Sequence, residues 1–240
     1  MGVDKEGKNL VQVYWIMGRS ENSRNRVLKI TPGVRGLLYT SAADPSKVKD
    51  PSLIIYNAMR EVNDDEDGTR SYIVSNGDQT DTVNDRLSAG TMQHGLGVYV
   101  QDRVHEPDIP NYTSRITGLY RSYMEGHKLL ELHIIRRSEF AKDDDLSDHT
   151  LFSYERDDVA IEAGFGRCIT TYGQYEDGVS SLKPFHGDPL LVPLRDTPQD
   201  ILRQYWNILN EENRISIAVK AVPLDGGPSS IEIINKYSEV

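Results

Sequence analysis

Runs of apolar residues that alternate with polar ones recur along the chain and predict strands more often than helices. Residues 56–75 reverse at Asp67-Gly68, and residues 114–136 reverse at Glu125-Gly126, which is the pattern of two β-hairpins. Five further segments are predicted as strands: 10–17, 26–30, 161–172, 215–222 and 231–237. We therefore expect a protein built mainly from sheets.

Helical patterns are fewer. Residues 78–87 predict a helix that Asp78 caps, and residues 95–102 predict a second, short helix. The clearest helix is 197–209, where Thr197 is the cap and Pro198 occupies the first turn. Its apolar face is expected to consist of Ile201, Leu202, Tyr205, Ile208 and Leu209.

Hairpins interrupted by two helical blocks predict a single α+β domain over residues 1–240, with helices covering sheets. We find no linker that would divide the chain. Two acidic stretches, 63–69 and 142–145, are interpreted as solvated loop tips, because neither has the spaced ligands and distal glutamate of an EF-hand.

The composition narrows the class of protein. A chain of 240 residues can bury a core without disulfides, and its single cysteine, Cys168, excludes an intrachain disulfide and fits a reducing compartment. A net charge of −10 argues against a broad contact with nucleic acid. No apolar run reaches the roughly 20 residues of a membrane span, and residues 1–8 do not resemble a signal peptide. We expect a soluble, cytoplasmic protein without nucleic-acid or membrane partners.

Segment 18–26, Gly-Arg-Ser-Glu-Asn-Ser-Arg-Asn-Arg, follows a predicted strand and holds three arginines, Arg19, Arg24 and Arg26. Guanidinium groups bind phosphate or carboxylate oxygens bidentately, and the N–H groups of a glycine-led turn add donors. The alternative is a solvated turn whose arginines pair with the abundant acids. The segment by itself favours that alternative.

Segment 75–82 joins a strand to a helix and contains the Asn76-Gly77 turn. The N–H groups at the start of the helix can hold an anion or the polar edge of a ring. Asp78 or Asp81 can equally serve only as a cap. The small polar residues after the turn exceed what one cap needs, so the sequence leaves both functions open.

Segment 104–115 contains two prolines and displays Glu106, Asp108, Thr113 and Arg115. A carboxylate held in a stiff loop suits general acid–base catalysis, in which position matters as much as pKa. The alternative is an ordinary connector, which this segment alone would favour.

Other patterns give little support for chemistry. The six histidines lack His-Glu-x-x-His spacing, so no protein metal site is expected. Gly164-Phe-Gly lacks the third glycine of a dinucleotide fingerprint and is interpreted as strand. Cys168 has no neighbouring histidine that would mark a nucleophile, and the chain has no Gly-x-Ser-x-Gly elbow or Walker loop. Composition and motif spacing therefore predict an α+β protein with a candidate anion site, and they indicate no more specific function.

Five segments, taken in order, resemble the archaeal-type IMP cyclohydrolase family: 14–26, 50–57, 75–82, 106–116 and 164–172. The first reads Tyr-Trp-Ile-Met-Gly-Arg-Ser-Glu-Asn-Ser-Arg-Asn-Arg, and the third reads Ser-Asn-Gly-Asp-Gln-Thr-Asp-Thr. The resemblance implies a four-layer αββα sandwich like that of N-terminal-nucleophile hydrolases. It also implies closure of 5-formamido-1-(5-phosphoribosyl)imidazole-4-carboxamide to IMP with loss of water, in purine biosynthesis. No hydride or phosphoryl group moves in that reaction, so no cofactor is expected.

The resemblance places roles on particular residues. Three of them fall where the family has residues important for activity: Glu106 to accept or relay a proton, Tyr56 to donate to the leaving formyl oxygen, and Arg26 to stabilise oxyanion charge or hold the nucleotide. The residues expected to bind base and ribose are Asn57, Asn76, Gly77, Asp78, Thr80 and Asp81, those for phosphate are Arg19, Arg24 or Arg115, and Asp108 and Thr113 complete the substrate-binding set. The expected partner is a purine nucleotide, and the protein is expected to be a homo-oligomer.

The chain departs from the family pattern at its start. Bacterial members usually carry a further apolar strand, with a Pro-Gly-Arg segment, before the stretch that matches residues 2–9, so we expect residues 2–9 to form the turn after a missing strand. Two rival functions remain: purine-nucleotide binding without turnover, and another amide hydrolysis on the shared fold. The second is limited because Gly2 follows Met1, which leaves no Ser, Thr or Cys as an N-terminal nucleophile.

Overall fold

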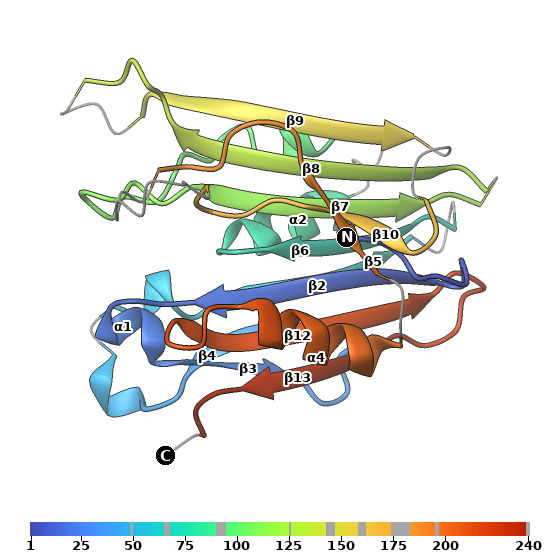
Figure 1. Cartoon of the computed structure of the whole chain (residues 1–240). Coiled ribbons are helices and arrows are strands. Elements are labelled where there is room, and N and C mark those ends of the chain that lie inside the picture. The colour runs from blue at the N-terminus through green and yellow to red at the C-terminus, as the bar shows by residue number, and fades with distance from the viewer. Residues whose placement is uncertain are drawn as a thin grey trace. The chain divides into compact units, whose positions relative to one another are not determined.

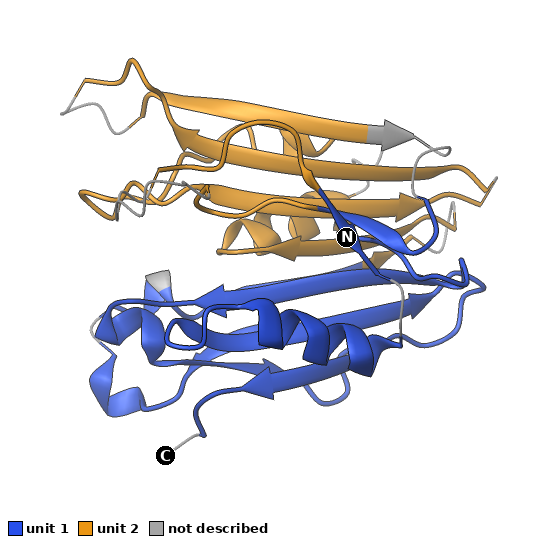
Figure 2. Cartoon of the chain, viewed as in Figure 1, with its two compact units in different colours: residues 1–61, 159–167, 191–240 blue, residues 62–158, 168–190 orange. Residues whose placement is uncertain are grey.

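The computed structural model of the chain describes residues 1–48, 50–64, 68–89, 95–124, 126–142, 147–157, 162–173, 183–194 and 197–238. The chain forms two compact units (Figure 2). Unit 1 comprises residues 1–61, 159–167 and 191–240, and unit 2 comprises residues 62–158 and 168–190. Each unit combines antiparallel strands with few helices, so the α+β class predicted from the sequence is confirmed.

Unit 1 contains a sheet with the strand order β11-β10-β1-β2-β12-β13 (Figure 1). A second antiparallel arrangement joins β3 to β4 and β4 to β5. The strands are β1 (Gly2–Val3), β2 (Asn9–Met17), β3 (Arg26–Ile30), β4 (Leu38–Ala42), β5 (Asn57–Asn63), β10 (Phe165–Cys168), β11 (Leu190–Pro193), β12 (Arg214–Pro223) and β13 (Ser230–Asn235). The helices are α1 (Glu21–Arg24), α4 (Pro198–Ile208) and the single 3₁₀ turns η1 (Pro45–Lys47) and η2 (Pro51–Leu53).

Unit 2 contains four antiparallel strands in the order in which they occur in the chain, β6-β7-β8-β9 (Figure 1). These strands are β6 (Arg70–Ser75), β7 (Arg115–Ser122), β8 (Lys128–Arg137) and β9 (His149–Asp157). Helices α2 (Gln79–Ser88) and α3 (Leu96–Tyr99) pack on this sheet through an apolar cluster. The cluster consists of Val62, Ile73, Val83, Leu87, Leu96, Tyr99, Val100, Leu119 and Ile135.

Helix α4 covers one face of the unit 1 sheet, because the apolar side of the helix matches the apolar side of β2 and β12. Its cap is as predicted: the Thr197 hydroxyl accepts the Asp200 N–H at 3.2 Å, and Pro198 lies in the first turn. The buried cluster consists of Val11, Leu194, Ile201, Leu202, Tyr205, Ile217 and Val219. The predicted apolar face is confirmed at Ile201, Leu202 and Tyr205. Ile208 is 67% exposed at the end of the helix, and Leu209 is the C-cap and only partly buried.

The opposite face of the same sheet buries polar groups, because side chains alternate along β2 and β12. Gln12 and Lys220 are partners across these strands, and both are fully buried. The Lys220 Nζ lies 2.7 Å from the Glu61 Oε1, and the Arg35 Nε lies 3.0 Å from the other carboxylate oxygen of Glu61. Burial lowers the pKa of Lys220, and the Glu61 carboxylate opposes this effect. The buried charges of this face are therefore paired.

A second buried ion pair supports α3 in unit 2. The Arg121 Nη2 lies 2.7 Å from the Glu131 Oε2, and the two side chains are 2% and 1% exposed. The other oxygen of Glu131 accepts the Leu96 N–H at 2.6 Å, at the start of α3. Burial raises the pKa of Glu131, against the effects of the Leu96 N–H and Arg121, and burial lowers the pKa of the adjacent His133 to about 4. His133 is therefore neutral at pH 7 and adds no positive charge beside Glu131.

Several predicted elements are confirmed, with small changes of boundary. Residues 114–136 form the β7–β8 pair, and residues 78–87 form α2. The short helix predicted over 95–102 is limited to α3, and the strand predicted over 161–172 is limited to β10. The latter begins only after Gly164, whose φ of 84° breaks the extended backbone. Two turn residues, Asp67 and Glu125, and parts of both acidic stretches lie outside the described residues.

Four strands correct the sequence-based picture. Strands β4, β9 and β11 are not predicted: β4 and β9 lack the continuous apolar runs that mark the others, and β11 is only four residues long. The expected turn over residues 2–9 is wrong at its start, because Gly2–Val3 forms β1 between β10 and β2. A Cβ on Gly2 would lie 2.2 Å from the Phe165 carbonyl oxygen, so only glycine allows β1 and β10 to come this close.

The Arg121–Glu131 pair predicts a non-additive effect on stability. Arg121→Met or Glu131→Gln alone should lower the free energy of unfolding by about 3–5 kcal/mol, because each leaves a buried charge without its partner. The double variant should lose less than either single variant, since no unpaired charge remains and the glutamine amide oxygen can still accept the Leu96 N–H. Guanidinium denaturation followed by circular dichroism measures the three values. A double variant that loses the sum of the two singles would contradict this account.

Candidate functional site

The turn after β6 is tied together by one amide. The Asn76 side-chain N–H donates to the Ser114 carbonyl oxygen at 3.0 Å and to the Thr171 hydroxyl at 3.2 Å. Its oxygen accepts the Ile116 N–H at 2.7 Å and the Gln79 side-chain N–H at 3.1 Å. Asn76, predicted to bind base or ribose, therefore joins the start of α2 to the start of β7 and to the segment that follows β10.

Gly77 lies where any side chain would enter a cluster of polar groups. A Cβ at this position would lie 2.5 Å from the Gln79 Oε1, 2.8 Å from the Arg115 Nη1 and 3.3 Å from the Glu106 Oε1. The turn thus brings three polar side chains from α2, β7 and the loop before β7 against one backbone position. Thr80 closes the same turn from inside: its buried hydroxyl bonds to the Gly77 carbonyl oxygen at 3.0 Å and to the Ser75 hydroxyl.

Asp78 does not cap α2 with its side chain, which corrects the sequence-based interpretation. Its two carboxylate oxygens instead accept from two arginines, Arg115 at 2.7 Å and Arg103 at 2.8 Å. Partial burial would raise the pKa of Asp78, but Arg115 and Arg103 outweigh it and hold that pKa below its usual range. Asp78 therefore bridges two guanidinium groups at the start of the helix, while Asp81 lies in the first turn of α2.

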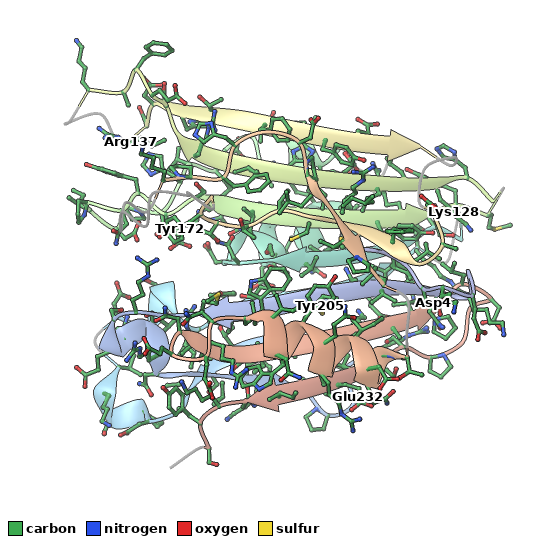
Figure 3. The ribbon with its side chains drawn as sticks, viewed as in Figure 1. Asp4, Lys128, Arg137, Tyr172, Tyr205 and Glu232 are labelled. Atoms are coloured by element: carbon green, nitrogen blue, oxygen red, sulfur yellow. The ribbon has the colours of Figure 1, made fainter. Side chains whose placement is uncertain are left out.

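The loop over residues 104–113 is closed by Asp108. Its carboxylate accepts the Thr113 N–H at 2.6 Å and the Thr113 hydroxyl, while its carbonyl oxygen accepts the Asn111 N–H at 2.8 Å. The Thr113 hydroxyl also bonds to the Tyr172 hydroxyl at 2.7 Å. Figure 3 places Tyr172 at the same end of unit 2 as Arg137. Asp108 and Thr113, predicted to bind substrate, hold the loop in shape.

This loop presents Glu106. Its N–H donates to the Thr113 carbonyl oxygen at 2.8 Å, and its side chain is 12% exposed with an oxygen 3.7 Å from the Arg115 Nη1. Arg115 is itself held by the Val104 carbonyl oxygen at 2.9 Å and by the Gln79 Oε1 at 2.9 Å. Both partners of this contact are therefore positioned by the backbone around them, as a general acid–base group requires.

His105 is buried directly behind Glu106. It is 1% exposed, and its Nδ1 lies 3.0 Å from the Glu106 carbonyl oxygen, so the ring carries its proton on Nδ1. The centroids of the His105 and Tyr112 rings are 5.5 Å apart, in an edge-to-face arrangement. The Arg137 guanidinium lies 4.1 Å from the centroid of the Tyr112 ring. This stack fixes the base of the loop.

The arginine segment of unit 1 has a different character. A Cβ on Gly18 would lie 2.6 Å from the Ser23 hydroxyl oxygen, so glycine is needed where the chain turns into α1. The Arg24 Nε donates to the Gly18 carbonyl oxygen at 3.2 Å, and the Arg26 Nε donates to the Ser23 carbonyl oxygen at 2.8 Å. Neither Arg24 nor Arg26 forms an ion pair with a carboxylate among the residues that the structure describes, so the predicted alternative of pairing with acids is not observed there.

The remaining predicted residues of unit 1 lie near the start of β5. Asn57 is its first residue and pairs with Tyr39 of β4. Tyr56 precedes it and is buried, with its hydroxyl 2.7 Å from the hydroxyl of Tyr14 on β2. Arg19, in the turn before α1, is exposed.

The structure brings together one group of predicted residues in unit 2, while those of unit 1 lie at two places. In unit 2 the group is Asn76, Gly77, Asp78, Thr80, Glu106, Asp108, Thr113 and Arg115. In unit 1 Arg24 is the last residue of α1 and Arg26 is the first residue of β3, while Tyr56 and Asn57 lie at the start of β5. Sequence reasoning missed Gln79, Arg103, Tyr172 and the partner of Tyr56, Tyr14. Tyr14 and Gln79 stood within the recognised segments, whereas Arg103 carried no pattern that could have marked it.

The described residues contain no group of three or more His, Cys, Asp or Glu side chains that could hold a metal ion. No helix in this part of the chain is long and apolar enough to cross a membrane.

These contacts define an α+β protein with two polar clusters: arginines anchored to carbonyl oxygens in unit 1, and a carboxylate beside an arginine in unit 2. The family model for "IMP cyclohydrolase-like protein" matches residues 1–226. The chain belongs to the IMP cyclohydrolase-like family, and the resemblance found in its sequence is confirmed. No curated protein matches the chain.

The two-arginine environment of Asp78 can be tested by titration. Arg115→Met should raise the pKa of Asp78 toward the ordinary value of 3.8, because one of its two cations is removed. In the wild type the lowered pKa contributes stability above about pH 4, which is lost as the pH falls through the pKa of the folded state. Carboxyl ¹³C NMR measures the pKa directly. Arg86→Met, which removes the partner of Asp102 instead, is the control; an unchanged Asp78 pKa in Arg115→Met would refute the assignment.

Proposed function

We propose that the protein is an IMP cyclohydrolase, which closes 5-formamido-1-(5-phosphoribosyl)imidazole-4-carboxamide to IMP with release of water. Membership of the IMP cyclohydrolase-like family supports this reaction class. The structural observation that carries the proposal is Glu106, a carboxylate that is 12% exposed and lies beside Arg115 at the head of a closed loop. Such a group suits a reaction that consists of proton transfers around one new bond.

The reaction makes one C–N bond and breaks one C–O bond. The carboxamide nitrogen attacks the formyl carbon, and one of its protons moves to the formyl oxygen. The hydroxyl group then leaves as water with a second proton, which the formamide nitrogen gives up when the ring becomes aromatic. No oxidant or group donor enters this balance. Holding the two reacting groups about 3–3.5 Å apart supplies a large part of the rate.

Glu106 is proposed to accept or relay the nitrogen protons. Its backbone N–H bond to Thr113 and the clasp made by Asp108 limit how the loop can move, so the carboxylate keeps one direction. Arg115 places a positive charge 3.7 Å from the Glu106 oxygen. Gly77 leaves room for this contact.

Tyr56 is proposed to donate a proton to the departing oxygen, and Arg26 to stabilise the negative charge that develops on it or to hold the nucleotide. The Arg26 guanidinium is fixed through its Nε by the Ser23 carbonyl oxygen, which leaves the planar group oriented without a carboxylate partner among the described residues. Because no described carboxylate neutralises it, the Arg26 guanidinium can attract an anionic group of the substrate.

The 5′-phosphate is proposed to bind Arg19 or Arg24 rather than Arg115. Arg115 already contacts the Asp78, Gln79 and Glu106 oxygens and the Val104 carbonyl oxygen. Within the described part of the chain, the Arg24 Nε and Nη2 bind only uncharged oxygens, those of Gly18 and Asn213. Asn57, Asn76, Gly77, Asp78, Thr80 and Asp81 stay proposed for base and ribose, with Asp108 and Thr113 supporting them.

Family membership supports further features as proposals. These are the four-layer αββα sandwich of N-terminal-nucleophile hydrolases, a single domain over residues 1–240, a homo-oligomer and a cytoplasmic location.

The decisive experiment is turnover by the purified protein, with Glu106→Gln beside the wild type. The wild type should form IMP from the formamido ribonucleotide in the presence of excess chelator. Glu106→Gln keeps the shape but loses the basic oxygen, so kcat should fall about 10²–10⁴-fold. The dissociation constant of IMP should change much less, because product binding needs no proton transfer. Chromatography of the nucleotides and calorimetry give the two quantities.

The exposed Glu139 of unit 2 provides the control, since Glu139→Gln should leave both quantities unchanged. IMP binding without turnover in the wild type would instead support a purine-nucleotide-binding protein. Equal losses of affinity and rate in Glu106→Gln would make Glu106 a residue that positions the ligand.

Arg26 provides a second test. Arg26→Ala should reduce kcat/KM about 30- to 1000-fold, which corresponds to about 2–4 kcal/mol of transition-state stabilisation. The reason is that a guanidinium group without a carboxylate partner has its charge available to the substrate. Steady-state kinetics on folded protein measures the change. Arg203→Ala, which removes an exposed arginine of α4 in the same unit, should have no effect; near-normal kinetics in Arg26→Ala would show that Arg26 only shapes the turn.

A further inference from the structure

The hydroxyl groups of Tyr14 and Tyr56 form a buried pair in unit 1. Their oxygens are 2.7 Å apart, the usual length of an O–H···O hydrogen bond, and the side chains are 7% and 8% exposed. The two residues are 42 positions apart in the chain and come from β2 and from the residue before β5. One hydroxyl must donate and the other accept.

The backbone of Tyr56 is fixed on both sides by Thr40 of β4. The Tyr56 N–H donates to the Thr40 hydroxyl at 2.9 Å, and the Tyr56 carbonyl oxygen accepts the Thr40 N–H at 2.9 Å. The Thr40 hydroxyl in turn donates to the Ile54 carbonyl oxygen at 2.7 Å. These bonds fix the backbone from which the Tyr56 side chain projects.

Packing does not explain the hydroxyl of Tyr14. Tyr14 lies on the same face of β2 as Gln12, away from the apolar face that α4 covers, and its partner across β12 is Ala218. A phenylalanine ring would fill the same space beside so small a partner. Burying a hydroxyl on this face costs free energy unless it is bonded, and the Tyr14 hydroxyl meets that condition through its bond to Tyr56.

We propose that Tyr14 is a positioning residue for the ring closure, in which its hydroxyl donates to the Tyr56 oxygen. This inference rests on the proposed function. The donated bond directs the Tyr56 proton away from Tyr14 and toward the substrate. When Tyr56 gives its proton to the departing hydroxyl group, the O–H electron pair stays on the Tyr56 oxygen, and the Tyr14 hydroxyl stabilises that charge.

The proton balance closes without another reactant. The departing oxygen gains the Tyr56 proton and leaves as water, and Glu106 gains the proton that the formamide nitrogen loses. Exchange with solvent water then returns a proton to Tyr56 and removes one from Glu106. Tyr14 keeps its own proton throughout, so it acts on the reaction only through Tyr56.

The test compares Tyr14→Phe with Tyr205→Phe. Tyr205 is the matched control because it is also a tyrosine of unit 1, is 8% exposed and uses its hydroxyl to bind a backbone oxygen, that of Pro193 at 2.8 Å. It is labelled on α4 in Figure 3. Tyr14→Phe should lower kcat about 10- to 100-fold, the usual effect of a residue that orients a reacting group, with KM and the IMP dissociation constant nearly unchanged. Tyr205→Phe should leave all three unchanged.

A spectroscopic measurement tests the positioning role of Tyr14 separately from the proposed function. With tyrosine labelled by ¹³C at the ring Cζ, the Tyr56 signal, assigned with Tyr56→Phe, should shift in Tyr14→Phe and stay in place in Tyr205→Phe. A Tyr56 signal that does not respond to Tyr14→Phe overturns the inference. So does a normal kcat in Tyr14→Phe when the wild type is active. A wild type that binds IMP but has no turnover overturns the proposed function, and the inference with it, even if the signal shifts.

Discussion

Charges and polar groups that leave water must find partners, and this requirement organises each unit. In unit 1 the inner face of the β2–β12 pair carries Lys220, whose charge is compensated by Glu61 at 2.7 Å. In unit 2 the charges of Arg121 and Glu131 compensate each other, and the Glu131 carboxylate also accepts the first N–H of α3. Apolar burial alone would tolerate several arrangements of these strands. Paired buried charges tolerate far fewer, because every alternative leaves a charge unpaired.

The same requirement creates the candidate site of unit 2. Asp78 attracts two arginines, and one of them, Arg115, also reaches Glu106. Hydrogen bonds to a backbone oxygen and to Gln79 fix that arginine before any substrate arrives. The result is a carboxylate with a defined neighbour and direction, which is the preorganisation that proton transfer needs. The contacts of Asn76 and Asp108 hold the turn and the loop on which this arrangement depends.

In unit 1 two arginines of segment 18–26 bind uncharged carbonyl oxygens, in contrast to the paired charges of unit 2. Arg24 and Arg26 are held by carbonyl oxygens, which carry no net charge, so the positive charge of the segment is not neutralised by the described residues. This state of Arg24 and Arg26 supports our proposal that the segment binds the substrate anion. The same unit also contains the buried, hydrogen-bonded hydroxyl pair of Tyr14 and Tyr56.

The sequence alone determined the α+β class, most strands, the α4 helix with its cap, and the family, because these depend on local periodicity and on segments that recur intact. It also marked Glu106 and Arg115 as candidate site residues within one stiff segment. Only the tertiary structure decided that Asp78 binds arginines instead of capping α2, that Arg103 joins the cluster, and that Tyr14 meets Tyr56. These contacts join residues 25 to 42 positions apart, and no local pattern encodes which distant side chain a polar group will meet.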